Sequence, residues 1–114
     1  MKKQDMLKKN KEFRYVVSRG KSYQSPNMVL ICAKSRAGVK VGFSVSSKLG
    51  NAVVRNRTKR IMRGGLTPLM PVLQQDKLYF FIARRGLIGR TSTFCFEEMR
   101  ALLQKAGLLN EESC

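Results

Sequence analysis

The sequence has 114 residues, enough for one domain with a single modest core, and we expect no second domain. Lysine and arginine number 23 against 7 acidic residues, a formal charge of +16, which predicts a polyanionic partner, either nucleic acid or an anionic membrane surface. Apolar residues make up 43% of the chain, which excludes a disordered basic tail, and no apolar run approaches the ~20 residues of a membrane-spanning helix.

The three cysteines, Cys32, Cys95 and Cys114, have no CxxC spacing, and the chain contains no histidine. This composition argues against a zinc site and favours a reducing compartment in which Cys32 and Cys95 serve as small apolar residues. The basic N-terminus is not followed by the apolar segment of a signal peptide. We therefore expect a cytoplasmic protein that holds no metal ion of its own.

The chain begins with a basic segment and a short helix. Residues 1–9 are a lysine-rich lead-in that we expect to be flexible. From Asn10 to Gly20 the spacing predicts an amphipathic helix, with Phe13, Val16 and Val17 on one apolar stripe.

Strand signals follow this first helix. Residues 21–24 form a brief extended segment before a turn, and residues 28–33 are a nearly continuous apolar run of strand length, although so short a run does not by itself exclude a helix. Residues 35–38 make a loop long enough for a hairpin into the next strand.

That next strand alternates in side-chain character. Val41, Phe43 and Val45 point to one side, and small residues point to the other: Gly42, Ser44 and Ser46. The small face leaves room for a nucleic-acid backbone and offers hydroxyl donors to phosphates or sugars. The alternative is close packing of a neighbouring helix against the same residues.

A turn over residues 48–51, with Asn51 as a plausible cap, predicts a helix that starts near Ala52. Its apolar stripe consists of Val54, Thr58, Ile61 and Met62. The remaining arc holds Arg55, Asn56, Lys59, Arg60 and Arg63, with Arg57 at the flank. No acidic residue occurs between Gly42 and Arg63, so the negative charge must come from outside the helix. Closely spaced cations without carboxylates suit a phosphate backbone, whereas a merely solvated face normally mixes both signs.

The C-terminal half adds a strand and a helix. Two glycines, Gly64 and Gly65, predict that the basic helix ends, frays or bends there, and residues 69–75 form a connector. Residues 76–85 are typical of a strand buried on both faces, followed by a basic loop over residues 86–90.

The last helix begins after the threonines at 91 and 93, and Gly107 ends it. Its core stripe is Cys95, Met99, Leu102, Leu103 and Ala106. Residues 110–114 are a polar tail. The predicted fold is a single-domain α+β sandwich with the element order α-β-β-β-α-β-α.

The segment from Gly50 to Arg60, which reads GNAVVRNRTKR, is preceded by Gly42 to Ser46 and by Lys48. Together these residues resemble the signature of the bacterial ribonuclease P protein subunit. Residues 7–13 also resemble that family's first helix, and residues 76–84 its last strand. The resemblance implies a ribosomal-protein-S5-domain-2-like fold over residues 1–114, with the basic helix in a crossover between strands.

The resemblance also implies a division of labour. The family's catalytic RNA, with its bound Mg²⁺, removes the 5′ leader of precursor tRNA, while one protein per RNA docks on it and holds the leader. The residues that would dock the catalytic RNA are Lys48, Asn51, Arg55, Asn56, Arg57, Lys59, Arg60 and Arg63. The residues that would line the leader cleft are Phe13, Val17, Ile31, Ser44 and Ser46.

The residues themselves predict no phosphodiester chemistry in this chain. There is no histidine for general acid or base catalysis, and the seven acids form no cluster that resembles a two-metal site. We therefore expect neither catalytic residues nor a protein-bound cofactor. The main alternative is a basic ribosomal scaffold protein without a processing role. A membrane-surface peptide would have to expose the apolar stripe of the basic helix.

Overall fold

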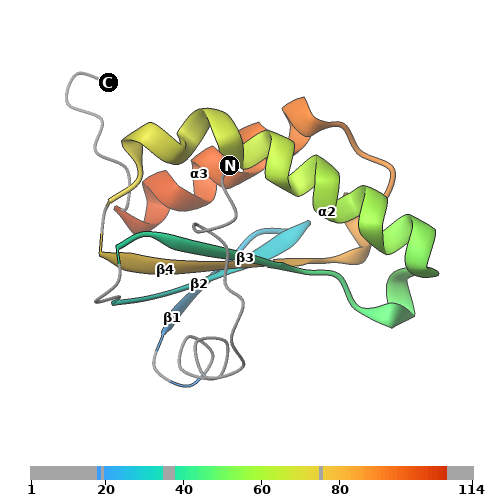
Figure 1. Cartoon of the computed structure of the whole chain (residues 1–114), viewed down its shortest axis with the longest axis horizontal. Coiled ribbons are helices and arrows are strands. Elements are labelled where there is room, and N and C mark those ends of the chain that lie inside the picture. The colour runs from blue at the N-terminus through green and yellow to red at the C-terminus, as the bar shows by residue number, and fades with distance from the viewer. Residues whose placement is uncertain (1–17, 19, 35–37, 75, 108–114) are drawn as a thin grey trace.

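The computed structural model describes residues 18, 20–34, 38–74 and 76–107. Within these ranges the chain forms a four-stranded sheet with two helices on one face (Figure 1). The strands and helices are β1 (Lys21–Gln24), β2 (Met28–Lys34), β3 (Lys40–Ser44), α2 (Ala52–Leu66), β4 (Lys77–Ala83) and α3 (Ser92–Ala106). Short 3₁₀ turns are η2 (Ser47–Leu49), η3 (Thr67–Val72) and η4 (Arg85–Leu87). The predicted lead-in, nearly all of the predicted first helix and the tail lie outside the described residues.

The strands are ordered β1-β2-β4-β3 in the sheet. β4 pairs antiparallel with β2, where Phe81 faces Leu30, and parallel with β3, where Phe81 faces Phe43. The prediction that β2 and β3 form a hairpin is therefore wrong, because β4 lies between them. β4 is apolar on both faces, so the centre of the sheet buries it best, and the α2 crossover returns the chain beside β3 in the parallel direction.

The core lies between the sheet and the two helices. Its fully buried members include Leu30, Val41, Met62, Phe81 and Met99. The predicted apolar stripes are confirmed. In α2, Thr58 and Met62 are buried and Val54 and Ile61 half-buried; in α3, Cys95, Met99, Leu102 and Leu103 are buried. Burial of these stripes leaves the opposite arc of each helix in solvent.

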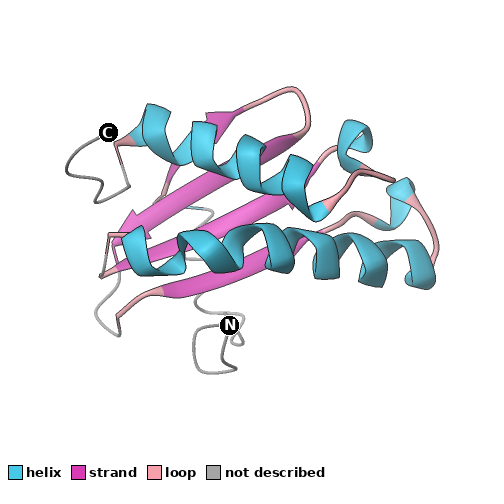
Figure 2. Ribbon diagram, turned by 90° about the horizontal axis from the view of Figure 1, so that it is seen from above, coloured by secondary structure: helices cyan, strands magenta, loops and turns pink. Residues whose placement is uncertain are grey.

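α2 continues through both of its glycines to Leu66, so the predicted end or bend at this point is wrong. The reason is tertiary packing. A Cβ atom on Gly65 would lie 2.8 Å from Cys95 Cβ and 2.9 Å from the backbone nitrogen of Phe96. The absence of a side chain at Gly65 lets α2 and α3 pack closely side by side, as the view from above shows (Figure 2). This close packing offsets the poor helix propensity of glycine.

Candidate nucleic-acid interface

A tight turn delivers the chain from β3 into α2. The Ser46 hydroxyl accepts a hydrogen bond from the backbone N–H of Lys48 at 3.2 Å, which starts the η2 turn. Gly50 then passes so close to the helix that an added Cβ would lie 2.7 Å from Val54 Cγ1. Asn51 is the predicted N-cap, and its Oδ1 accepts from the Val54 N–H at 3.0 Å. The turn thus fixes the start of α2 and, with it, the positions of the first cationic side chains on the helix.

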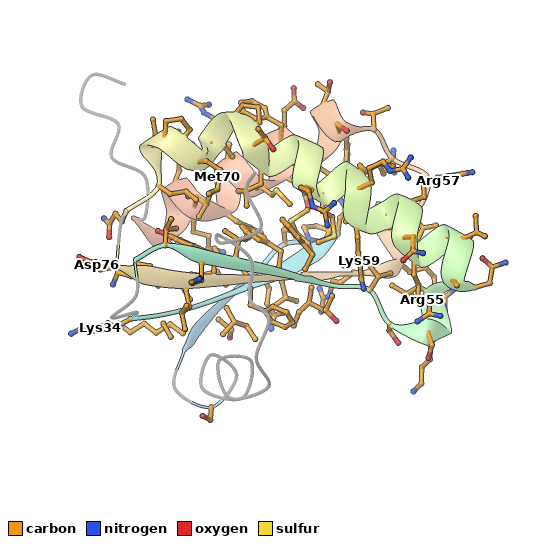
Figure 3. The ribbon with its side chains drawn as sticks, in the orientation of Figure 1. Lys34, Arg55, Arg57, Lys59, Met70 and Asp76 are labelled. Carbon is orange, nitrogen blue, oxygen red and sulfur yellow. The ribbon has the colours of Figure 1, made fainter. Side chains whose placement is uncertain are left out.

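The outer arc of α2 is cationic, as predicted. Asn56, Arg57, Arg60 and Arg63 are exposed, and Arg55 and Lys59 are half-buried. Figure 3 shows Arg55 and Lys59 on the side of α2 that faces the sheet, while Arg57 lies on the other side. The helix therefore presents positive charge on both of its flanks and along its crest. An extended polyanion can contact such a surface over its whole width.

Arg55 carries an unsatisfied donor. Its Nε atom is buried and makes no hydrogen bond to any residue within the described ranges. A buried donor without an acceptor destabilises a protein by about 1–3 kcal/mol, and by more when it is charged. In this conformation the Nε is also closed to a ligand, so a phosphate oxygen would reach it only after the half-buried Arg55 side chain had moved.

The second predicted surface lies on the other face of the sheet. Ile31 and Ser44 both point away from α2 and α3, on β2 and β3 respectively. Ser46 lies beyond the end of β3 and is exposed, with its hydroxyl engaged by η2. Phe13 and Val17, the other members of the predicted leader cleft, lie outside the described residues.

The sequence did not indicate which residues lie between Ile31 and Ser44 on this face of the sheet. Phe80 and Ile82 of β4 share their face, and Phe80 is paired directly with Ile31 on one side and Gly42 on the other. Because β4 is apolar throughout, its sequence does not assign aromatic residues to faces. Only the pairing register does so.

Sequence reasoning also left a basic segment outside the predicted site. Because β3 and β4 are parallel, the segment after β4 lies at the same end of the sheet as η2 and the start of α2 (Figure 1). There the Arg84 guanidinium donates to the Ser25 carbonyl oxygen at 3.1 Å, and Arg90 stacks 4.7 Å from the Phe94 ring centre. Arg85 is exposed between them. These contacts hold two more cations in place near the α2 surface.

The described part of the chain contains no group of three His, Cys, Asp or Glu residues that could hold a metal ion. Burial, with a contribution from the Glu98 carboxylate, raises the pKa of the Cys95 thiol to about 11. Burial also raises the pKa of the Cys32 thiol, an effect that the Lys77 ammonium partly offsets. Both thiols are therefore protonated at neutral pH and unsuited to nucleophilic attack. Within the same residues, no helix has the length and apolar character needed to cross a membrane.

Fold and surface together define a small α+β protein that carries a cationic, acid-free helix in the crossover between two parallel strands, a design suited to binding a polyanion. The family model described as Ribonuclease P matches residues 1–107. The chain belongs to the ribonuclease P protein family, which confirms the resemblance seen in its sequence.

Relatives and solved structures agree with this assignment. The chain is 39% identical to the ribonuclease P protein component of Clostridium beijerinckii over 93% of its own length and 91% of the relative's. Its fold matches the RNase P protein of Staphylococcus aureus with a TM-score of 0.81 and 28% identity, over 93% of this chain and 98% of the other. The RNase P protein of Thermotoga maritima, at 24% identity, shares the fold with a TM-score of 0.69 over 96% and 98% of the two chains. Family membership implies an RNA partner and a part in endoribonuclease activity.

Proposed function

We propose that this chain is the protein subunit of a ribonuclease P ribonucleoprotein and that α2 docks it on the catalytic RNA. The observation that carries this proposal is the outer arc of α2, where cations occur without a single carboxylate on the helix. Neutralising phosphates releases condensed counterions and reduces the repulsion between two RNA molecules.

The other sheet face is proposed to contact the single-stranded 5′ leader of precursor tRNA. Ile31 and Ile82 are half-buried and provide apolar surface there, with Phe80 buried beside Ile31, and the Ser44 hydroxyl provides a hydrogen-bonding group. Apolar contacts read no base edge and so tolerate any base, as a leader of variable sequence requires. The catalytic RNA would bind on the face that carries the helices and the leader on the opposite face. The two RNAs would therefore not compete for the same residues.

In this proposal the RNA, with Mg²⁺, hydrolyses the phosphodiester bond and the protein supplies binding. The chain offers no histidine, and its acids are spread from Asp5 to Glu112. One protein is expected per catalytic RNA, and the complex would act in the cytoplasm.

The test is cleavage of a precursor tRNA by a bacterial ribonuclease P RNA at low Mg²⁺, with and without this protein. We expect cleavage at the mature 5′ end only when the protein is present, because its cations replace part of the Mg²⁺ that screens the two RNAs. The protein alone, incubated with the same substrate, is the control for catalysis by the chain itself. An inert protein that binds ribosomal RNA tightly would favour a ribosomal scaffold instead.

Arg60→Ala tests the docking surface directly. Arg60 is exposed on the crest of α2, so its removal leaves the core intact. We expect weaker binding to the catalytic RNA and a plot of log affinity against log salt that is less steep by about one counterion. An unchanged slope would exclude Arg60 from the interface.

A further inference from the structure

Three lysines on one face of the sheet gather at the end opposite to the start of α2, where Lys40 also begins β3 but points to the other face. Lys34 ends β2 and lies directly across from Lys77, the first residue of β4. Lys21 begins β1 and is paired with Cys32, two residues before Lys34. We call these three residues the far-end lysines. They occupy three neighbouring strands of the sheet.

The far-end lysines share one face, which is the face that α2 and α3 cover. Side chains alternate along a strand, and Tyr23, Cys32 and Tyr79 all belong to the core on that face. Each far-end lysine stands two residues from one of them and therefore points to the same side. Lys21 and Lys34 are exposed, Lys77 is half-buried, and Figure 3 shows Lys34 extending beyond the end of its strand.

This arrangement has a cost in the free protein. Like charges placed directly opposite one another on paired strands are destabilising. Among the residues that the structure describes, no carboxylate forms an ion pair with Lys34 or Lys77. The sheet thus brings two ammonium groups together; the exposed Asp76 precedes Lys77 in the chain, but no ion pair joins it to either lysine.

We infer that the far-end lysines form a second contact with the phosphate backbone of the catalytic RNA. They lie on the same side of the sheet as α2, so an RNA that covers α2 can reach them without passing around the sheet. The length of β4 separates them from the start of α2 by roughly 20 Å, at about 3.3 Å per residue. Because α2 runs back along the sheet from that start towards β4, the far-end lysines would lengthen the cationic surface of α2 and so add to the affinity for the RNA. The inference rests on the proposed function.

Lys34→Glu separates a binding role from a structural one, because the two predict different results. In the free protein the substitution places a carboxylate opposite Lys77, and we expect Tm to rise by about 1–4 °C. In RNA binding it removes one phosphate contact, and we expect a salt slope lower by about 0.9 together with weaker affinity. If Lys34 is solvated and does not contact the RNA, Lys34→Glu would raise Tm and leave the affinity and the salt slope unchanged.

The measurement uses the full chain and a transcribed bacterial ribonuclease P RNA over a range of salt concentrations. Lys34→Arg keeps the charge and is the matched control. We expect it to bind with the salt slope of the unsubstituted chain. If Lys34→Glu lowers Tm, Lys34→Gln provides the comparison, since it removes the repulsion without adding a charge. Binding and slope equal to those of the unsubstituted chain in Lys34→Glu, or in Lys34→Gln where that variant is the comparison, would overturn the inference. If the unsubstituted chain itself fails to bind that RNA, the proposed function fails instead.

Discussion

α2 and α3 are a matched pair that differs in one respect. Both helices have 15 residues, both begin with a side-chain cap, and both bury an apolar stripe against the same face of the sheet. Their outer arcs differ, because α3 mixes Glu97 and Glu98 with Arg100 and Lys105, whereas α2 carries cations without an acid. The packing stripe places a helix on the sheet, and the outer arc determines which partner it can meet.

The largest expected effect on RNA binding comes from removing the positive charge that distinguishes the outer arc of α2 from that of α3. Replacing Arg57, Arg60 and Arg63 together by alanine should lower the salt slope of RNA binding by about 2.7, since each phosphate contact contributes about 0.9. The control is Lys105→Ala on α3, for which we expect the slope of the unsubstituted protein. Salt-dependent binding to ribonuclease P RNA provides the measurement. Equal effects per charge on the two helices would mean that net charge alone, rather than α2, directs binding.

The next effect concerns what the two helices share, their close packing. Gly65→Ala should lower the free energy of unfolding by about 1–3 kcal/mol, because the new methyl group meets the backbone of α3. Gly64→Ala is the matched control. Its Cβ would lie 3.1 Å from the Ser92 hydroxyl, which is exposed and can turn away, so we expect a gain of up to about 1 kcal/mol from helix propensity. Denaturant unfolding measures both, and a neutral Gly65→Ala would contradict the packing argument.

The smallest effect separates the two caps. Asn51→Ala and Thr91→Ala each remove a side-chain oxygen that accepts from a backbone N–H, at 3.0 Å and 3.1 Å. We expect each substitution to lower stability by about 1 kcal/mol. Only Asn51→Ala should also weaken RNA binding, because it loosens the first turn of α2. Thermal unfolding and binding, measured on the same samples, compare the two. If RNA binding is unchanged in both variants, Asn51 serves the helix alone.

The sequence predicted local features well wherever spacing carries the information. The α2 stripe, its cap at Asn51 and its acid-free arc can be found by counting residues, because a helix repeats every 3.6 residues. The alternation from Val41 to Val45 likewise assigned the core face of β3. The docking and leader roles of individual side chains stay predictions.

The errors arose where distant parts of the chain decide the structure. The hairpin between β2 and β3 was favoured by their closeness in sequence, yet β4 inserts between them. The poor helix propensity of Gly65 predicted an interruption, yet contact with Cys95 requires a glycine there. Phe80 could not be assigned to a face, because a strand apolar on both sides shows no period. Each of these features needs a partner that local sequence does not name.

The central place of β4 has a consequence for how the protein acquires its structure. β4 pairs with both β2 and β3, although 32 residues separate Ser44 from Lys77. During synthesis the cationic α2 segment emerges before the strand that completes the sheet beneath it. Until β4 arrives, the edges of β2 and β3 that it will occupy are unpaired, and such edges are prone to aggregation. A ligand that prefers the folded state stabilises it only once β4 has joined the sheet, so the length of this interval is set by synthesis and not by RNA.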